Sequence, residues 1–259
     1  MSEREMSAVR IAAVLLILGL VMIACAFAAT GFHPVALSRR IAGYEERTAD
    51  FVGAFSRVRI QDVDASVRVL PSEAGRCSVH YDETDRSTYH IEIVNDALVI
   101  EHERDWLDSF GIFWSAPRLT VYLPRAAYEE ISVHTVSGGI QIEGLECAEM
   151  NLDATSGGIR LTDVRVFSGP AYRTLDDGSA NAGLLSARTV SGGIRLDGVD
   201  AERLDLHTVS GGIKGTLRSG KMFEASSVSG RVRVPESTPG AGICRASTTS
   251  GGISITVEE

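Results

Sequence analysis

The sequence is poor in cysteine, in aromatic residues and in positive charge, and each shortage argues against a class of protein. It has four cysteines in 259 residues; Cys25 lies in a long apolar run, and Cys77, Cys147 and Cys244 lack metal-ligand spacing. Acidic residues outnumber basic ones by 34 to 25, and aromatic residues make up only 6%. Nucleic-acid-binding proteins typically carry a basic stripe interleaved with aromatic residues. We therefore expect no nucleic-acid partner and no metal site, and we expect Cys147 and Cys244 to be small buried apolar residues.

Recognisable catalytic and cofactor motifs are lacking as well. The serines that recur along the chain do not lie in the Gly-x-Ser-x-Gly context that exposes a nucleophile. Lys214 follows two glycines, but the spacing of a phosphate-binding loop is absent. His134 and His207 fall on the parity that we expect to face solvent, among other polar residues. We expect no catalytic residues, no cofactor and no enzyme activity, and a polysaccharide-active enzyme is the least favoured function.

The tripeptide Ser-Gly-Gly, by contrast, recurs throughout the second half of the chain. Successive serines lie 156−137 = 19, 210−191 = 19, 229−210 = 19 and 250−229 = 21 residues apart, and one interval, 191−156 = 35, is close to two periods. Ser229-Gly230-Arg231-Val232 is a worn copy of the tripeptide, and a barely legible copy near Asp176-Asp177-Gly178 suggests a distorted coil in the long interval. A fixed period of this length indicates one structural unit stacked on copies of itself. The proposed corner residues are Ser137, Gly138, Gly139, Ser156, Gly157, Gly158, Ser191, Gly192, Gly193, Ser210, Gly211, Gly212, Ser229, Gly230, Ser250, Gly251 and Gly252.

The residues around each tripeptide alternate between apolar and polar, which is typical of strands. Ile131, Val133 and Thr135 share the inward parity with Ser137, and the glycines after them permit a sharp corner with positive φ. Apolar residues resume after each corner, so three short strands fit into one period. The sequence therefore predicts an all-β, single-stranded β-solenoid (β-helix) of about 19-residue coils, with a Thr/Ser ladder at the corners. An antiparallel sandwich with glycine-rich turns is the alternative.

The N-terminal region predicts a membrane tether. Ile11 to Ala29 is an uncharged apolar run of suitable length for a membrane-spanning helix. An uncleaved signal anchor, cleavage after Ala26-Phe27-Ala28 and lipidation at Cys25 are the three interpretations, and each places residues 33–259 outside the cytoplasm. The predicted organisation is a short tail, a transmembrane helix or signal anchor, a juxtamembrane linker, an irregular β region that caps or starts the solenoid, and the regular repeats: residues 1–10, 11–32, 33–50, 51–130 and 131–257.

One aromatic segment does not alternate. Residues 106–117 hold both tryptophans of the chain, and this stretch is either a plug over the first coil or an exposed loop that contacts a membrane, lipid or partner. The candidate contact residues are Trp106, Phe110, Ile112, Phe113 and Trp114.

The strand ending at Tyr122-Leu123-Pro124, followed by the repeat Ile131 to Ile140 and its copies, resembles the bacterial "putative adhesin" β-solenoid family. The resemblance covers residues 51 to 257 and implies a membrane-anchored or secreted envelope protein without catalytic residues. We therefore expect a membrane-tethered, extracytoplasmic, adhesin-like binding module whose partner is an envelope protein, a peptide, a lipid or a glycan. A sensor of envelope stress or antimicrobial peptides, acting through a partner, is the alternative.

Overall fold

The computed structural model describes residues 44–84, 87–104, 117–168 and 183–258. The chain divides into two units, Met1–Tyr44 with Gly111–Ser115, and Glu45–Phe110 with Ala116–Glu259. Every described residue except Tyr44 belongs to the second unit. These residues contain strands and no helix, which confirms the all-β class, and among them no helix is long and apolar enough to cross a membrane. The apolar run 11–29, most of the aromatic segment 106–117 and the barely legible copy at 176–178 lie outside the described residues.

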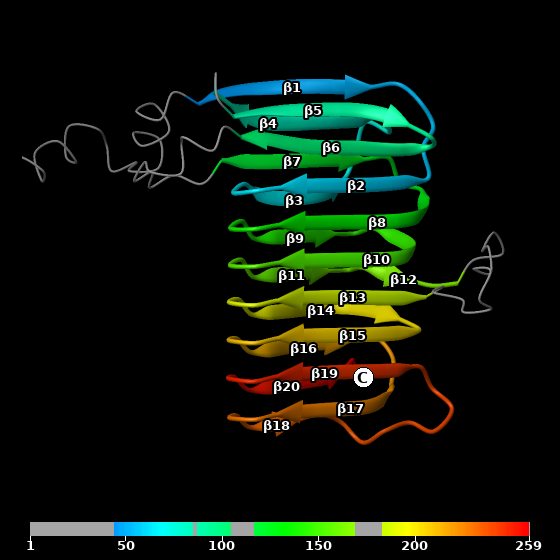
Figure 1. The fold of residues 1–259 in the computed structure, drawn as a ribbon. Coiled ribbons are helices and arrows are strands. Elements are labelled where there is room, and N and C mark those ends of the chain that lie inside the picture. The colour runs from blue at the N-terminus through cyan, green and yellow to red at the C-terminus, as the bar shows by residue number, and fades with distance from the viewer. Residues whose placement is uncertain (1–43, 85–86, 105–116, 169–182, 259) are drawn as a thin grey trace, which may run out of the picture. The chain divides into compact units, whose positions relative to one another are not determined.

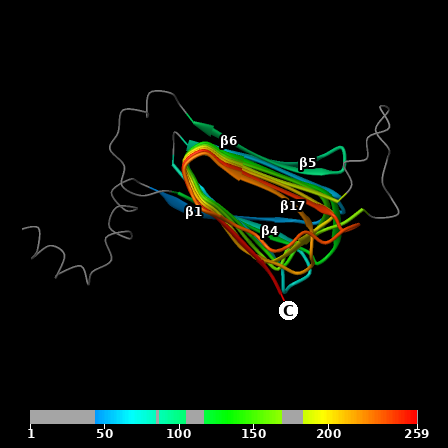
Figure 2. The same ribbon diagram turned by 90° about the horizontal axis from the view of Figure 1, so that it is seen from below.

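Two sheets run side by side through the second unit and meet along one edge (Figures 1 and 2). We call them sheet A and sheet B. Sheet A has the strand order β1-β4-β7-β3-β9-β11-β14-β16-β20-β18. Sheet B has the order β5-β6-β2-β8-β10-β13-β15-β19-β17. The strands are β1 (Glu45–Phe51), β2 (Arg57–Asp62), β3 (Ser66–Pro71), β4 (Cys77–Glu83), β5 (Ser87–Val94), β6 (Ala97–Arg104), β7 (Arg118–Leu123), β8 (Ala127–Thr135), β9 (Ile140–Glu143), β10 (Glu146–Ala154), β11 (Ile159–Thr162), β12 (Arg165–Val166), β13 (Leu184–Thr189), β14 (Ile194–Ala201), β15 (Arg203–Thr208), β16 (Ile213–Leu217), β17 (Met222–Ser227), β18 (Val232–Arg233), β19 (Ile243–Thr248) and β20 (Ile253–Val257).

A sheet B strand, a corner and the following sheet A strand form one rung, and the rungs stack in register. Because the pairing between rungs is parallel, equivalent side chains form columns about 4.8 Å apart. One column on sheet B consists of Ile131, Met150, Leu185, Leu204, Cys244 and Phe223. Its counterpart on sheet A consists of Val67, Ile140, Ile159, Ile194, Ile213, Ile253 and Val232. Most members are fully buried, and burial of each such side chain contributes about 1.5–3 kcal/mol.

The third side of each rung is shorter than the sequence suggested. It consists of the two-residue strand β12 and of the adjoining ends of β10 and β14, which pair with it. Leu145, Val164 and Val199 are buried behind this side. The predicted third strand is therefore present only as a brief pairing, and the two long faces are sheets A and B.

The 35-residue interval contains no additional rung, contrary to the expectation of a distorted coil. Strand β13 pairs directly with β10, and β14 pairs directly with β11. The rungs that carry Ser156 and Ser191 are therefore neighbours, and the residues between β12 and β13 are an insertion.

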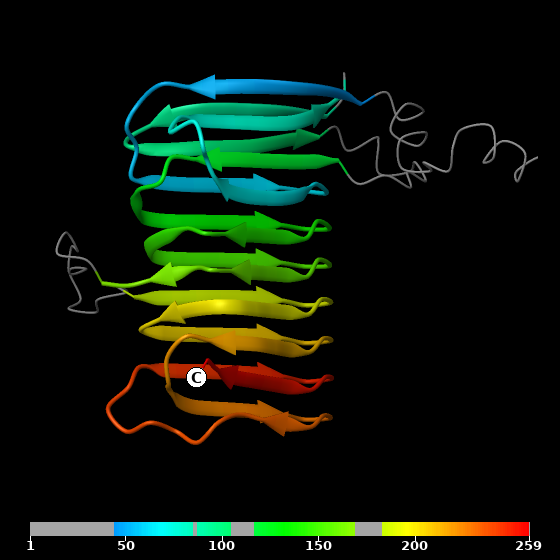
Figure 3. The same ribbon diagram turned by 180° about the vertical axis from the view of Figure 1, so that it is seen from behind.

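The order of rungs along the stack departs from chain order at the C-terminal end. Strands β19 and β20 pair with β15 and β16 on one side and with β17 and β18 on the other. After β16 the chain passes over one layer, forms the terminal rung β17/β18, and returns to fill the gap with β19/β20 (Figures 1 and 3). The expectation that consecutive copies stack in order is therefore wrong for the copies at Ser229 and Ser250.

Three antiparallel strands cover the N-terminal end of the stack. The rung β2/β3 lies inside, between β8/β9 and β6/β7, and β1, β4 and β5 pair beyond it in antiparallel fashion. An uncovered parallel rung would expose a strand edge that could pair with other chains. The outermost strand of sheet A, β1, is rich in charged and exposed residues, which discourages such pairing.

Candidate functional site

The corner glycines are required by close contact between rungs and not by an unusual backbone conformation. None of them has a positive φ, so the expected left-handed corner is wrong. A Cβ on the first glycine would lie against the backbone of the preceding rung, for example 1.8 Å from the Gly138 carbonyl oxygen for Gly157 and 2.2 Å from the Gly157 oxygen for Gly192. No side chain fits such a gap, so the first glycine sets how closely the rungs approach.

The second glycine faces the opposite way. A Cβ on Gly158, Gly193 or Gly212 would lie 3.1–3.2 Å from a carbonyl oxygen of the following rung. In the terminal rung β17/β18 this position is Arg231, which is exposed, whereas the first position remains Gly230. No described rung stacks beyond Arg231. The worn copy of the repeat therefore marks the end of the stack.

Threonine hydroxyls connect the rungs at the corner. Thr189, Thr208 and Thr248 each donate a 2.8 Å hydrogen bond to the carbonyl of the first glycine in the neighbouring rung. Ser227 makes the same bond in the terminal rung. The expected hydroxyl ladder is present in this form, with bonds to backbone oxygens. The repeat serines, which we expected on the inward parity, are exposed, because the strand ends at the threonine and alternation stops there.

The corners of successive rungs align along one edge of the stack (Figure 1). The glycine columns leave a groove along this edge. It has a volume of about 540 Å³ and crosses several rungs. Its lining consists of the second glycines, the isoleucines that follow them and the side chains one residue further on: Ser66, Gly139, Ile140, Gln141, Gly158, Ile159, Arg160, Gly193, Ile194, Arg195, Gly212 and Lys214. No aromatic side chain takes part.

A row of cations follows the groove on the outer face of sheet A. In register, the row reads Arg68, Gln141, Arg160, Arg195, Lys214, Ser254 and Arg233, and we call it the cation row. Its five basic side chains are on exposed residues. Within the described ranges none of the five forms an ion pair. A column of unpaired like charges is unfavourable for a stack, since neighbours on adjacent strands repel.

The outer face of sheet B is arranged differently. Three of its arginines pair with carboxylates on adjacent strands: Arg59 with Glu130 at 3.7 Å, Arg188 with Asp205 at 3.0 Å and Arg245 with Glu224 at 2.8 Å. Cross-strand pairs of opposite charge stabilise a sheet. His134 and His207 lie on this face and are exposed, as expected.

The three cysteines among the described residues are unsuited to act as nucleophiles. Cys77, Cys147 and Cys244 are all buried and free, which confirms the expectation for Cys147 and Cys244. Burial raises the pKa of Cys77 to about 11, with a further contribution from Asp50. Burial also raises the pKa of Cys244 to about 12, although Lys221 opposes the shift. These thiols therefore stay protonated, and thiolate chemistry needs the deprotonated form.

A family comparison matches most of the chain. The model of the Toastrack DUF4097 family matches residues 55–259. The chain belongs to this family. The Toastrack match spans the whole stack of rungs from β2 onwards, and it supports the resemblance to the "putative adhesin" family.

Several solved structures are similar to this Toastrack chain, at low identity. A "putative cell adhesion protein" from Clostridium sporogenes is 12% identical, with a TM-score of 0.49 over 83% of this chain and 100% of that one. A "putative adhesin" from Bacteroides fragilis is 15% identical, with a TM-score of 0.36 over 83% and 97%. A "putative lipid binding protein" from Parabacteroides distasonis is 13% identical, with a TM-score of 0.36 over 84% and 97%. Among curated proteins, none matches.

The cation row was missed in the sequence, although its signal is present. Three of its five basic residues stand directly after the isoleucine that follows the second glycine, as in Gly158-Ile159-Arg160, Gly193-Ile194-Arg195 and Gly212-Ile213-Lys214. The residues predicted from the sequence as candidate contacts, Trp106, Phe110, Ile112, Phe113 and Trp114, lie outside the described residues.

Proposed function

We propose that this protein is a non-catalytic, adhesin-like binding module that holds an extended, negatively charged glycan along its corner groove. The observation that carries the proposal is the cation row, which lines the groove while the chain as a whole has a net charge of −9. The three cations Arg160, Arg195 and Lys214 lie in the groove lining at equivalent positions of successive rungs. A regular row of this kind suits a ligand that is itself a polymer.

Carboxylate or phosphate groups of a glycan would provide the partners that the cation row lacks. An exposed ion pair contributes only about 0–1 kcal/mol, so a single contact would be weak. Several contacts along one polymer act together, because each bound unit raises the effective concentration of the next. A nucleic acid fits less well, since single strands are bound by stacking of bases on aromatic side chains and the groove has none.

The envelope location is part of the same proposal. The apolar run Ile11–Ala29 would tether the solenoid to a bacterial membrane and leave the groove outside the cytoplasm. Separation of cells into membrane and soluble fractions, with protease treatment of intact cells, tests the tether and its orientation independently of ligand binding. A chain found in the soluble cytoplasmic fraction would contradict this part of the proposal.

The binding test uses polygalacturonate as the acidic glycan and dextran as the neutral one, in isothermal titration calorimetry. We expect the protein to bind polygalacturonate and not dextran, and we expect the affinity to fall as salt rises. The triple variant Arg160→Gln/Arg195→Gln/Lys214→Gln should bind about tenfold more weakly, since three contacts of about 0.5 kcal/mol each are lost.

A second triple variant provides the matched control. Arg59→Gln/Arg188→Gln/Arg245→Gln removes the same charge from the outer face of sheet B, where the arginines already have partners. We expect it to retain the affinity of the wild type. An equal loss in both variants would mean that only net charge matters, and no binding of polygalacturonate by the wild type would reject the proposal.

A further inference from the structure

The column of buried corner residues changes its chemistry at the N-terminal end of the stack. Thr135 pairs in register with Asp62 of β2, so Asp62 takes the place that threonine has in later rungs. Strand β6 pairs with β2 up to Glu101 and Gln61, and the next residue in each strand is His102 and Asp62. An aspartate and a histidine therefore replace the hydroxyl in two neighbouring rungs, where the linkage between rungs needs only a threonine.

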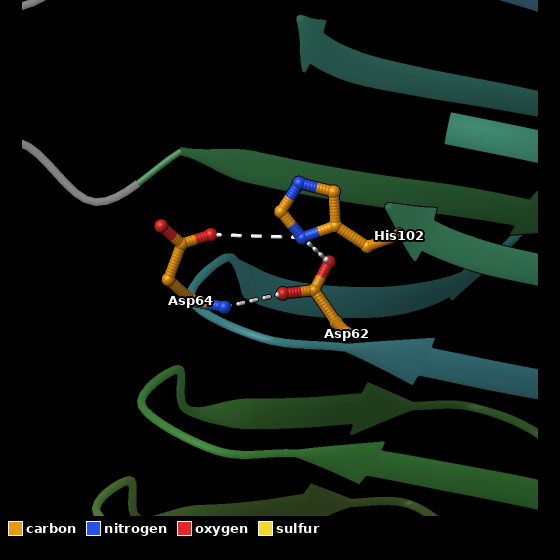
Figure 4. Close-up of side chains that lie close together, drawn as sticks. All are labelled: Asp62, Asp64 and His102. Carbon is orange, nitrogen blue, oxygen red and sulfur yellow. Dashed lines mark hydrogen bonds and ion pairs between the residues drawn. The ribbon is translucent and has the colours of Figure 1, made fainter. Parts of the chain in front are cut away.

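A second aspartate completes a cluster at this corner (Figure 4). The Nδ1 atom of His102 lies 3.8 Å from an Oδ2 atom of Asp62 and 3.7 Å from an Oδ1 atom of Asp64. One ligand atom from each of the three residues lies within 4.8 Å of the other two. The side chains of His102 and Asp62 are fully buried, and that of Asp64 is 19% exposed.

The Nδ1 atom of His102 is buried and has no hydrogen-bond partner among the described residues. It points between the two carboxylates, at separations that are too long for hydrogen bonds (Figure 4). A buried polar atom without a partner normally costs about 1–3 kcal/mol, and such atoms are rare in native proteins. The position therefore calls for a group between the imidazole and the carboxylates.

The surrounding contacts hold the three side chains in place. The Nε2 atom of His102 lies 2.7 Å from the Ser87 hydroxyl oxygen, which can accept a hydrogen bond from the Nε2–H group and so leave the Nδ1 lone pair free. The Oδ1 atom of Asp62 accepts hydrogen bonds from the amides of Asp64 and Ala65, so the carboxylate closes the corner. Its Oδ2 atom accepts a 2.6 Å bond from the Tyr89 hydroxyl, and the Tyr89 ring stacks on the His102 ring.

We infer that Asp62, Asp64 and His102 bind a divalent first-row transition metal ion, for which zinc is the appropriate probe. Metal–nitrogen and metal–oxygen bonds of about 2.0–2.1 Å in tetrahedral geometry place ligand atoms about 3.4 Å apart, close to the separations at Nδ1. Imidazole is a typical ligand of these ions, whereas calcium takes six to eight oxygen atoms. Three protein ligands leave one position for water or another donor.

The ion would join two rungs. Asp62 and Asp64 belong to the corner after β2, and His102 belongs to β6 in the next layer toward the N-terminal cap. A bound metal would therefore fix β6, together with the covering strand β5 that pairs with it, to the rung β2/β3. This inference is independent of the glycan proposal, because the site lies within the stack and not in the groove lining.

The test measures zinc binding by the full chain after treatment with a chelator and removal of the chelator. We expect about one equivalent of zinc by elemental analysis and calorimetry, and a rise in melting temperature when zinc is added. His102→Gln should weaken binding by about tenfold or more. The control is His90→Gln, which removes an exposed histidine that lies 3.5 Å from Glu92 on β5, and which should leave zinc binding unchanged.

A spectroscopic measurement covers the case in which His102→Gln does not fold. Cobalt(II) added to the wild-type chain should give the visible absorption of a four-coordinate site with nitrogen and oxygen ligands, and zinc should displace it. Less than half an equivalent of zinc on the wild type, or an undiminished affinity in folded His102→Gln, would overturn the inference.

Discussion

The arrangement of positive charge differs between the cation row of sheet A and the outer face of sheet B. On sheet B, arginines from β2, β13 and β19 pair with carboxylates on neighbouring strands. On sheet A, the cation row stands without ion pairs within the described residues and borders the groove. In-register stacking makes cross-rung pairing easy, because every outward position lies opposite its equivalent in the next rung. The cation row lacks such pairs although the stack can form them, as Arg118 of β7 and Asp82 of β4 do elsewhere on sheet A, so the charges of the row stay available to a ligand.

The contrast between the two sheets depends on rungs that stack in register. The first glycine of each Ser-Gly-Gly corner has the strongest influence on this stacking. Gly192→Ala would place a Cβ 2.2 Å from the Gly157 carbonyl oxygen, where only backbone could move aside. We expect the free energy of unfolding to fall by about 3 kcal/mol or more, measured by urea denaturation. Both faces should lose their register together.

Two control substitutions separate crowding from general intolerance at the corner. In Gly193→Ala the added Cβ would lie 3.2 Å from the Gly212 carbonyl oxygen of the next rung, so the free energy of unfolding should fall by about 1 kcal/mol. Arg231→Gly, at the second position of the terminal rung, should change stability by less than about 0.5 kcal/mol. If Gly192→Ala is as mild as Arg231→Gly, the close approach of the rungs does not limit the sequence.

Two lysines allow a second comparison, between a buried paired cation and an exposed unpaired one. Lys221, in the connection that passes over β19/β20, is buried and lies 2.9 Å from an Asp200 carboxylate oxygen, and Ser219 also donates to Asp200. We expect Lys221→Met to destabilise the protein by about 2–3 kcal/mol, since it leaves a partly buried carboxylate without its cation. Lys214→Met, in the cation row, should have almost no effect on stability.

The ion pair between Lys221 and Asp200 predicts that the stability of the protein depends on pH. Burial alone would raise the pKa of Asp200, but hydrogen bonds from Ser219 and Lys221 and the charge of Lys221 outweigh it, and the pKa is lowered. A lowered pKa in the folded state stabilises the protein above the unfolded value of about 3.9 and loses that effect as pH falls through the folded value. The difference in melting temperature between wild type and Lys221→Met should therefore shrink below pH 4. A difference that is constant down to pH 2 would contradict the linkage.

The repeat predicted the rung but not the way in which rungs connect. Alternation around Thr135 and the copies of Ser-Gly-Gly predict strands, corners and inward columns, because these are local properties that every copy shares. Stacking order is not a local property. The spacings between Ser210, Ser229 and Ser250 do not reveal that the rung of Ser250 lies between the rungs of Ser210 and Ser229. Arg231 in place of the second glycine does carry that information, once the direction of each glycine is known.

The rung β2/β3, the first along the chain, was not recognised in the sequence because its corner lacks the Ser-Gly-Gly tripeptide. Asp62-Val63-Asp64-Ala65-Ser66 stands where later rungs have Thr-x-Ser-Gly-Gly. The apolar spacing is the same, since Val67 follows Val58 by 67−58 = 9 residues and Ile140 follows Ile131 by 140−131 = 9. A search for that spacing without the tripeptide would find this rung. It would not find His102 beside Asp62, because that contact depends on β6 entering the stack next to β2.

The smallest effect we predict compares two arginines of one rung, Arg188 on sheet B and Arg195 on sheet A. Arg188→Gln loses a 3.0 Å pair with Asp205, so we expect a loss of about 0.5 kcal/mol at low salt that disappears as ionic strength rises. Arg195→Gln loses no ion pair and relieves repulsion from Arg160 and Lys214, so it should leave stability unchanged or raise it slightly. Urea denaturation at two salt concentrations distinguishes these outcomes. If Arg195→Gln is the more destabilising of the two, the cation row holds the fold together, and the contrast between the two faces cannot be assigned to a ligand.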